Sequence, residues 1–594
     1  MKLSHSTPRL FSLGLALALA PACSSDGNPL DGSEGTGGSV VSGDSGGAPG
    51  AGGPGAGGVT TGGPGAGGLV SGSSGGASSG GASASAGGDA GVGGAPTSSG
   101  SASSAGGATG GASEGSGGEP VMGSGGAIEE LPPAAPEGVI PNEPYNGNLP
   151  SNKGDWRTGL ISPTLELDHH NQPAIINGYL FISGNSRFWM YDISDSTKPK
   201  QLSFKKSPDD NPTREAEGHQ VTFAKHGNRL YAATIQGYGV DIWDITSATD
   251  PKLAKTIKIQ GINFGDFTSA VWGLSWQGNH LFVGGTDTGV HVIDATNPSE
   301  AKLVGRLANV GGVNAGPLYA IGNVLVVTTP KNNKGIATVD ISNPTNPVLL
   351  DTVPPGEAGA DSYIGAFYRH HAYLLNPIRV YDVLSNPANI QLVPGTRPGG
   401  YFEYMSFQDD FMFAGRIRPE PGATKINVSN MGNFTFVRDI YGRRDLSEND
   451  DQFTIAVGNL LIMSDDQLSP VTNKYAGTVI AVHDKNPDTK PPAVDWVIPK
   501  AGATGQALTT RIGISFTDNI ELATVDARSF IVRPVGGQPI AGTFGVTMSV
   551  LNFEPNEPLQ PGTTYEIILP AGGVKDLVGN GIAEEFKATF TTRT

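Results

Sequence analysis

The chain has 594 residues, 88 of them Gly and only one of them Cys, and its formal net charge is −17. This charge argues against a nucleic-acid partner, because binding a phosphate backbone requires a basic surface. The single cysteine excludes disulfide bonds within the chain, so the folded part must be stabilised by burial of apolar side chains.

The first 22 residues have the order of a secretory signal peptide. Lys2 and Arg9 precede an apolar run at residues 10–20 that is too short to span a bilayer, and small residues lead to Cys23. The segment Leu-Ala-Pro-Ala-Cys resembles the bacterial lipobox, whose cysteine becomes the lipidated first residue of the mature protein. The resemblance implies lipidation of Cys23 and an exported protein that a lipid anchor holds at the outer membrane or the cell surface. Secretion without lipidation, with cleavage near Cys23, is the alternative.

The next segment, residues 23–150, has a low-complexity composition. Between residues 24 and 127 it is almost wholly Gly, Ser, Ala and Thr, and it contains no Lys or Arg. Such a segment has too little apolar surface to offset the entropy lost on ordering. We therefore expect residues 23–150 to be a disordered Gly/Ser/Ala-rich tether that holds the folded part away from a membrane surface.

Residues 151–492 contain an internal repeat with a period of about 45 to 50 residues. Each clear copy has a Gly-Asn pair, an alternating apolar stretch that ends in Asp, and a closing Asp-Pro or Asn-Pro, as at residues 227–251, 278–298 and 322–344. Alternation predicts strands, Gly-Asn predicts a tight hairpin turn, and Pro ends a strand. Three or four strands in each of about seven copies predict an all-β fold with a β-propeller of about seven blades.

The third strand of each copy carries a family resemblance. The strands at residues 240–244 and 290–294 resemble the LVIVD repeat, a bacterial β-propeller repeat, which implies the same fold for residues 151–492. An aspartate recurs at the end of this strand in five copies. Because recurrence within one chain indicates a structural role, we expect these aspartates to accept hydrogen bonds in the following turn. They are Asp192, Asp244, Asp294, Asp340 and Asp382.

The final stretch, residues 493–594, has its own strand pattern. It alternates at residues 512–516, 565–569 and 586–592, which predicts an Ig-like β-sandwich as a separate unit. Residues 553–565, the segment Asp-Leu-Val-Gly-Asn at 576–580 and the closing strand resemble the bacterial Ig-like domain first described in S-layer proteins. The resemblance implies a spacer or adhesive module without chemistry of its own.

The candidate ligand site follows from the predicted ring of blades. The turn that enters the innermost strand of each blade lies at one mouth of the channel, so exposed polar residues there converge from distant parts of the chain. Clustered carboxylates, imidazoles and aromatic rings suit a sugar or a cation such as Ca²⁺. The candidate ligand-binding residues are Asp168, His169, His170, Glu217, His219, Tyr363, Glu403, Tyr404 and Asp451.

These features favour a binding or scaffold protein over an enzyme. No nucleophile, base and orienting group occur at the spacing of a known motif, so we predict no catalytic residue and no bound cofactor, with a divalent cation as the alternative. The expected partners are the membrane, through the anchor, and a protein, glycan or cation ligand. A hydrolase or lyase acting at the channel mouth is the other interpretation, because fold alone does not decide function.

Overall fold

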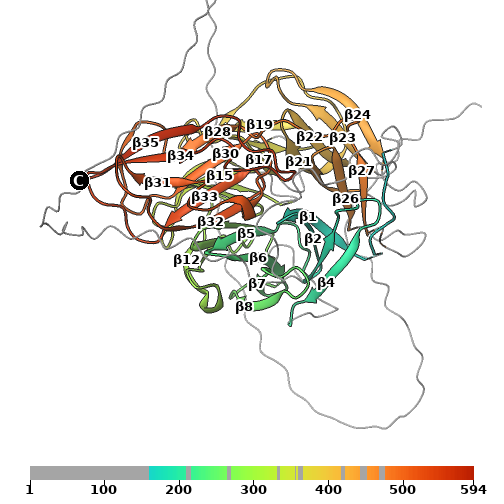
Figure 1. Cartoon of the computed structure of the whole chain (residues 1–594), viewed down its shortest axis with the longest axis horizontal. Coiled ribbons are helices and arrows are strands. Elements are labelled where there is room, and N and C mark those ends of the chain that lie inside the picture. Colours follow the sequence, from blue (N-terminus) through green and yellow to red (C-terminus); the bar gives the residue numbers. More distant parts are fainter. Residues whose placement is uncertain are drawn as a thin grey trace, which may run out of the picture. The chain divides into compact units, whose positions relative to one another are not determined.

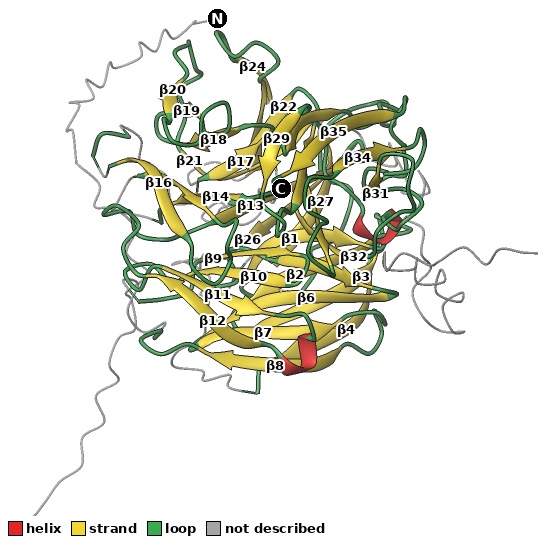
Figure 2. Cartoon of the chain, turned by 90° about the vertical axis from the view of Figure 1, so that its left-hand side faces the viewer, coloured by secondary structure: helices red, strands yellow, loops and turns green. Residues whose placement is uncertain are grey.

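The computed structural model describes residues 159–166, 168–208, 216–263, 269–330, 335–354, 356–358, 365–416, 422–441, 451–466, 475 and 477–594. Cys23, the expected tether at residues 23–150 and Tyr363 lie outside the described residues. Within the described ranges the chain forms strands and two short 3-10 helices, η1 (Pro298–Glu300) and η2 (Leu522–Thr524) (Figure 2). None of the helices in these ranges has the length and apolar character to cross a membrane.

Seven small antiparallel sheets follow one another along the chain as the blades of a β-propeller (Figure 1). In the first four blades the strands are β1 (His170–Ile176), β2 (Tyr179–Gly184), β3 (Arg187–Asp192), β4 (Lys200–Lys206), β5 (Thr222–His226), β6 (Arg229–Gln236), β7 (Gly239–Asp244), β8 (Lys252–Lys258), β9 (Gly273–Gln277), β10 (His280–Gly284), β11 (Val290–Asp294), β12 (Lys302–Leu307), β13 (Leu318–Ile321), β14 (Val324–Thr328), β15 (Ile336–Asp340) and β16 (Val348–Val353). The last three contain β17 (Ala366–Tyr368), β18 (His371–Leu374), β19 (Arg379–Asp382), β20 (Gln391–Leu392), β21 (Phe402–Gln408), β22 (Phe411–Arg416), β23 (Gly422–Asn427), β24 (Thr435–Tyr441), β25 (Phe453–Val457), β26 (Leu460–Asp465) and β27 (Gly477–Val482). The predicted all-β propeller is confirmed.

The seventh blade is completed from the start of the described chain. Its own sheet has three strands, β25 to β27. Leu160 and Leu165 form antiparallel bridges with Ala481 and Thr478 on the outer side of β27. The first and last segments of the propeller therefore share one blade, which closes the ring and gives the outer side of β27 a partner.

The recurring aspartates have the structural role that the sequence predicts. In each of these five blades the carboxylate accepts a hydrogen bond from the backbone nitrogen two residues later, for example from Thr246 to Asp244 at 3.0 Å and from Ser342 to Asp340 at 2.7 Å. The Gly-Asn pairs form the turns between the first and second strands, with φ of 59° at Gly278 and 53° at Gly322. Positive φ is the conformation for which glycine is favoured in such turns.

The C-terminal region is the predicted β-sandwich. One of its sheets has the order β28 (Val494–Ile498), β30 (Ile512–Phe516), β33 (Val550–Pro555) and β32 (Gly542–Thr547). The other has the order β29 (Ala503–Gln506), β35 (Phe586–Thr592), β34 (Thr564–Leu569) and β31 (Ile531–Pro534).

The sandwich is not separate from the propeller, in contrast to the expectation from sequence. Strand β32 pairs antiparallel with β5, the innermost strand of the second blade, so that the two parts share an eight-stranded sheet (Figure 1). The two parts also share one hydrophobic core, in which Phe181 and Phe223 of the propeller lie with Phe544 and Phe553 of the sandwich. The free edge of an innermost strand is a ready partner for another strand, and burial of these rings stabilises the pairing.

Hydrogen bonds fix the sandwich to the inner hairpins of the first four blades. Glu521 accepts from the backbone nitrogens of Asn177 and Gly178 at 2.7 and 3.1 Å. In the second blade, Lys225 Nζ donates to the carbonyls of Ala523 and Val525 at 3.0 and 2.8 Å.

The third and fourth blades continue this series of contacts. Glu554 Oε2 accepts from the backbone nitrogen of Asn279 at 2.8 Å, and Asn552 Oδ1 accepts from that of Gly322 at 3.0 Å. Asn552 and Glu554 are both buried, so both acceptors are shielded from solvent.

The hairpins of the other three blades also touch the C-terminal part of the chain. His370 Nδ1 lies 2.7 Å from Asp495 Oδ2, and the backbone nitrogen of Asp409 donates to the carbonyl of Thr517 at 2.6 Å. In the seventh blade, Val578 packs in one cluster with Val457 and Leu460. All seven inner hairpins thus contact the C-terminal part, which covers this end of the ring.

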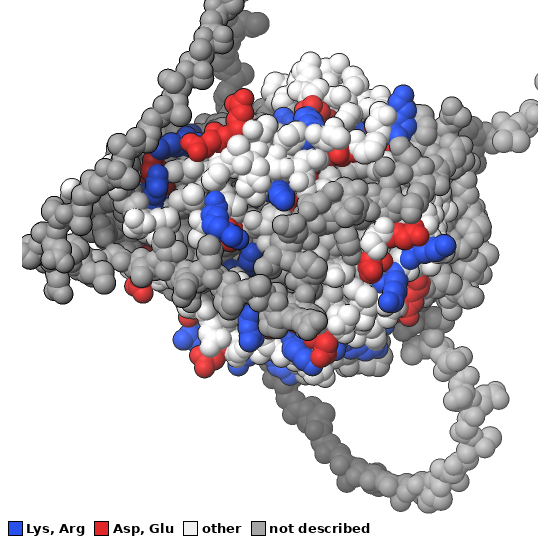
Figure 3. All heavy atoms as spheres, in the orientation of Figure 1, with Lys and Arg blue, Asp and Glu red and all other residues white. Residues whose placement is uncertain are grey.

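On the face shown in Figure 3, basic and acidic side chains are interspersed over the described surface. Pairs of opposite charge at the surface fit this picture, such as Lys205 with Asp250 at 3.4 Å and Arg229 with Asp244 at 3.1 Å. Exposed pairs of this kind contribute little to stability, so the fold depends on its apolar core.

Candidate functional site

The candidate site lies at the end of the inner strands opposite the sandwich. Strand β5 runs from the candidate site toward the sandwich. Residues 217–221 lie before its first residue, and Lys225 near its last residue donates a hydrogen bond to the sandwich. Residues just before an innermost strand therefore lie at the far end of the channel. Most of the candidates chosen from sequence are of this kind.

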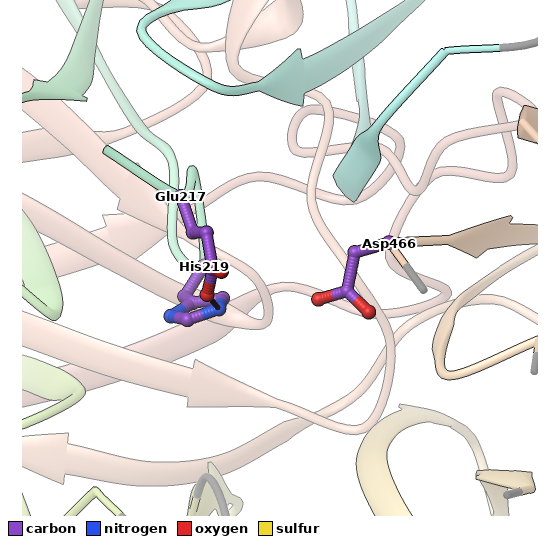
Figure 4. Close-up of side chains that lie close together, drawn as sticks. All are labelled: Glu217, His219 and Asp466. Atoms are coloured by element: carbon purple, nitrogen blue, oxygen red, sulfur yellow. Dashed lines mark ion pairs between the residues drawn. The ribbon is translucent and has the colours of Figure 1, made fainter. Parts of the chain in front are cut away.

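Glu217 and His219 form the centre of the site (Figure 4). Glu217 Oε2 lies 2.7 Å from His219 Nε2. A third residue, Asp466 after strand β26, joins them: one ligand atom from each of the three side chains lies within 4.8 Å of the others. Asp466 was not among the residues predicted from sequence, because it follows the second strand of a blade and not the turn before the first.

Aromatic rings enclose the imidazole of His219. Its ring centroid lies 4.2 Å from that of Trp272 and 5.9 Å from those of Tyr404 and Phe453. Tyr404 and Phe453 stack at 3.8 Å. His219 and Tyr404, which are 185 residues apart in the sequence numbering, are therefore brought together as the sequence analysis predicts.

His169 extends the site on the side of the first blade. Burial lowers its pKa to about 4, although the carboxylate of Glu217 opposes the shift. Its ring nitrogens lie 2.8 Å from Asn185 Nδ2 and 3.3 Å from Asn171 Nδ2. Asn171 Nδ2 also donates to Asp466 Oδ2 at 3.3 Å, so His169 and Asp466 share an amide neighbour. The imidazole of His169 is neutral at pH 7.

His170 belongs to the packing between the first and last blades. Its Nδ1 lies 2.8 Å from Thr478 Oγ1 in β27, and its ring packs in a T-shaped arrangement with Trp189, with the ring centroids 4.4 Å apart. Burial lowers its pKa to about 3. These contacts give His170 a structural role at the closure of the ring.

The remaining candidates lie around this centre. Asp168 forms a 3.2 Å ion pair with Arg187, and Asp451 pairs by a backbone bridge with Arg416 of the sixth blade. Glu403 lies half-buried near the start of β21. Tyr363, outside the described residues, has no structural account.

The expectation that the candidates are exposed turn residues is wrong for five of them. His169, His170, His219, Tyr404 and Asp451 are all buried, the last only 3% exposed. The physical reason is that the inner strands converge toward the channel axis, so residues before them pack against neighbouring blades. Substitution of these side chains will therefore affect stability as well as binding.

A small cavity adjoins His219 inside the channel. Its volume is about 20 Å³, which is room for a water molecule or a single ion and not for an organic ligand. Met548, at the tip of the β32–β33 hairpin, closes the cavity on the side of the sandwich. The lining consists of Gln172, His219, Gln220, Pro317, Tyr319, Ala366, Tyr404, Met405 and Met548.

This arrangement has two chemical capacities. An imidazole and two carboxylates are a donor set that divalent metal ions accept in proteins. A carboxylate in contact with an imidazole is also the pair used to move protons in acid–base catalysis. Both depend on Glu217 and His219.

Comparison with protein families identifies two parts of the chain. The bacterial Ig-like domain family matches residues 488–592, and the LVIVD repeat family matches residues 270–309 and 331–354. The comparison with curated proteins gives no match for this sequence.

Solved structures with a similar arrangement of strands share little sequence with the chain. The Cps50 (Swd1) β-propeller domain of Myceliophteria thermophila is 13% identical over 54% of this chain and 99% of that domain, with a TM-score of 0.39. A protein from Lactobacillus plantarum is 13% identical over 48% and 86% of the two chains, with a TM-score of 0.37. A putative 6-phosphogluconolactonase from Bacteroides fragilis is 12% identical over 45% and 83%, with a TM-score of 0.36. The chain thus combines LVIVD repeats, folded as a β-propeller, with a C-terminal bacterial Ig-like domain.

Proposed function

We propose that this chain is a binding or scaffold protein of the bacterial cell envelope, exported and held by a lipid anchor at Cys23 and a flexible tether. Its ligand binds at the end of the propeller channel opposite the sandwich. The observation that carries the proposal is the difference between the two ends of the ring. The sandwich covers the end with the inner hairpins, whereas Glu217, His219 and Asp466 gather at the other.

The chemistry of that end limits the ligand. The cavity beside His219 is too small for an organic molecule, so a larger ligand contacts the rim and not the channel interior. On the rim, Glu217 keeps 14% of its side chain exposed and Asp168 keeps 27%. These carboxylates and the guanidinium of Arg187 suit hydrogen bonds to a glycan or contact with a cationic group.

One observation favours a second candidate function. The 2.7 Å contact between Glu217 and His219 is the geometry of an acid–base pair, as in a hydrolase or lyase. Against this, Trp272, Tyr404 and Phe453 surround the imidazole, which leaves it little access to a substrate. We therefore place binding first.

The test uses the purified full chain and two defined envelope probes, insoluble peptidoglycan and vesicles of lipopolysaccharide. Co-sedimentation measures retention of the wild type, of Glu217→Gln and of a control, Asp294→Asn. Asp294 is the last residue of β11 in the third blade and is not part of the site. We expect retention by one probe, at least tenfold weaker for Glu217→Gln and unchanged for Asp294→Asn.

Two results would contradict the proposal. Equal retention of Glu217→Gln and wild type would show that the channel end does not bind the probe. Absence of retention together with turnover of glycan or ester substrates that Glu217→Gln abolishes would establish the enzyme instead.

A further inference from the structure

A second group of carboxylates lies where the propeller meets the sandwich, away from the channel site. Asp409 is in the turn between β21 and β22, Asp488 is in the segment before β28, and Asp518 follows β30. One carboxylate oxygen from each lies within 4.8 Å of the others. Three separate segments therefore place negative charge at one point of the junction.

These carboxylates are largely removed from water. Asp518 is 3% exposed and Asp409 is 7% exposed, while Asp488 is half-buried. Ionised carboxylates this close together and this deeply buried are costly unless a cation compensates their charge.

A buried amide oxygen beside the carboxylates is a second observation that points to a cation. Gln408 Nε2 donates to Asp488 Oδ2 at 3.1 Å, which places the carboxamide of Gln408 on the cluster. Gln408 is 5% exposed, and its Oε1 is buried with no hydrogen-bond donor among the described residues. An acceptor in this position costs free energy unless something positive meets it. An amide oxygen is also a common ligand of hard cations.

Among the ion pairs of the described residues, one reaches a carboxylate of this group, and its cation is Lys490. Lys490 Nζ lies 3.3 Å from Asp409 Oδ1 and 3.3 Å from Asp410 Oδ2, with 52% of its side chain exposed. It pairs with Asp409 from the solvent side. One half-exposed ammonium that pairs with Asp409 does not balance the three carboxylates of the cluster.

We propose that Asp409, Asp488 and Asp518, with Gln408, bind one Ca²⁺ ion that fastens the sandwich to the sixth blade. The donors are all oxygens, which Ca²⁺ prefers and which do not favour softer metals. Two oxygens about 2.4 Å from one Ca²⁺ are at most about 4.8 Å apart, so the separation in this group fits a shared ion.

The test uses the full chain, treated with EDTA and dialysed, and Ca²⁺ itself as the probe. Calorimetric titration and thermal unfolding are measured for the wild type, for Asp518→Asn and for Asp410→Asn, a control in the same turn that lies outside the three-carboxylate group. We expect Ca²⁺ to bind the wild type and raise its Tm. Asp518→Asn, which keeps the side-chain shape, weakens binding at least tenfold and loses the Tm response, while Asp410→Asn keeps both.

A second readout reports on the site directly. Tyr368 donates a hydrogen bond to the carbonyl of Asp409, so Tb³⁺ in the site is close enough for excitation through this ring. Should Asp518→Asn fail to fold, Asp488→Asn at the half-buried position replaces it in both assays. No Ca²⁺ binding by the wild type, or binding by Asp518→Asn and Asp488→Asn that equals that of the wild type, would overturn the proposal.

Discussion

The carboxylate of Glu521, in the sandwich, accepts a hydrogen bond of 2.7 Å from the backbone nitrogen of Asn177, in the first blade. The same carboxylate accepts from Gly178 at 3.1 Å and from Ala523 of its own segment at 3.0 Å. Glu521 is fully buried, and burial raises its pKa while these three hydrogen bonds oppose the shift. One side chain thus accepts hydrogen bonds from backbone nitrogens in a hairpin turn of the propeller and at the start of η2.

Replacing Glu521 with Leu should lower the free energy of unfolding by about 2 to 6 kcal/mol. The change leaves the backbone nitrogens of Asn177 and Gly178 buried without acceptors, and each such loss costs roughly 1 to 3 kcal/mol. Guanidinium denaturation of the full chain measures the difference. Glu584→Gln, at an exposed position of the sandwich, is the control, and equal midpoints for the two variants would contradict the account.

Replacing Asp340 with Ala should cost about 1 kcal/mol, because Ser342 loses the acceptor of its backbone hydrogen bond. Asp340→Asn should cost less, since an amide oxygen can take the same place. The sixth blade already uses Asn427 there, which accepts from Ser429 at 3.0 Å. Denaturation midpoints of the two variants provide the measurement. An equal loss for Asn and Ala would show that the charge of Asp340 matters and that the turn hydrogen bond does not.

These turns show how much of the fold the sequence predicts. Strand, turn and repeat signals are local, so Gly-Asn, the strand-ending Asp and the Asn-Pro pairs predict the blades and the role of the recurring aspartates. Because these signals are local, they do not predict how the sandwich contacts the propeller. Gly322 has the sequence of any hairpin turn, and nothing in it indicates that its backbone nitrogen binds Asn552, 230 residues away.

The site shows the same division between local and distant information. The proximity of Glu217, His219 and Tyr404 was predicted because residues before inner strands converge at one end of a ring. Asp466 was missed because its segment has no repeat signal of its own, and its position depends on the packing of the seventh blade against the first. The burial of His219 was also missed, because the aromatic rings around it come from three other blades.

Stability should fall at acid pH partly through His483. Its Nε2 lies 2.9 Å from the carbonyl of Gly458, and Lys425 Nζ lies 3.2 Å from its Nδ1. Burial, with the ammonium of Lys425, lowers the pKa of His483 to about 3, although Asp484 opposes this. The unfolded chain takes up this proton near pH 6.5, so the stabilisation is complete above pH 6.5 and is lost as the pH falls toward about 3.

The measurement for His483 compares wild type with His483→Gln by denaturation at pH 7.5 and pH 4.5. We expect the wild type to lose more stability than the variant between these two values, because the amide does not titrate. Parallel losses in the two proteins would assign the acid sensitivity to other groups.

The proposed lipid anchor at Cys23 predicts the effect of a single substitution. In the producing bacterium, Cys23→Ser should move the protein from the membrane fraction to the soluble fraction, because one acyl-bearing residue is the expected attachment. Incorporation of a labelled fatty acid measures the modification in the wild type. Retention of the variant in membranes, with no label in the wild type, would show that Cys23 is not lipidated.

The central claim is that the sandwich covers one end of the ring and leaves the other for the ligand. Hydrogen exchange of the full chain, read by mass spectrometry on peptides from the inner hairpins, tests it most directly. The backbone nitrogens of Asn177, Gly178, Asn279, Gly322 and Asp409 all donate to groups of the sandwich. The account predicts that they exchange as slowly as amides within the strands. Fast exchange at these turns beside protected strands would show an uncovered ring and contradict it.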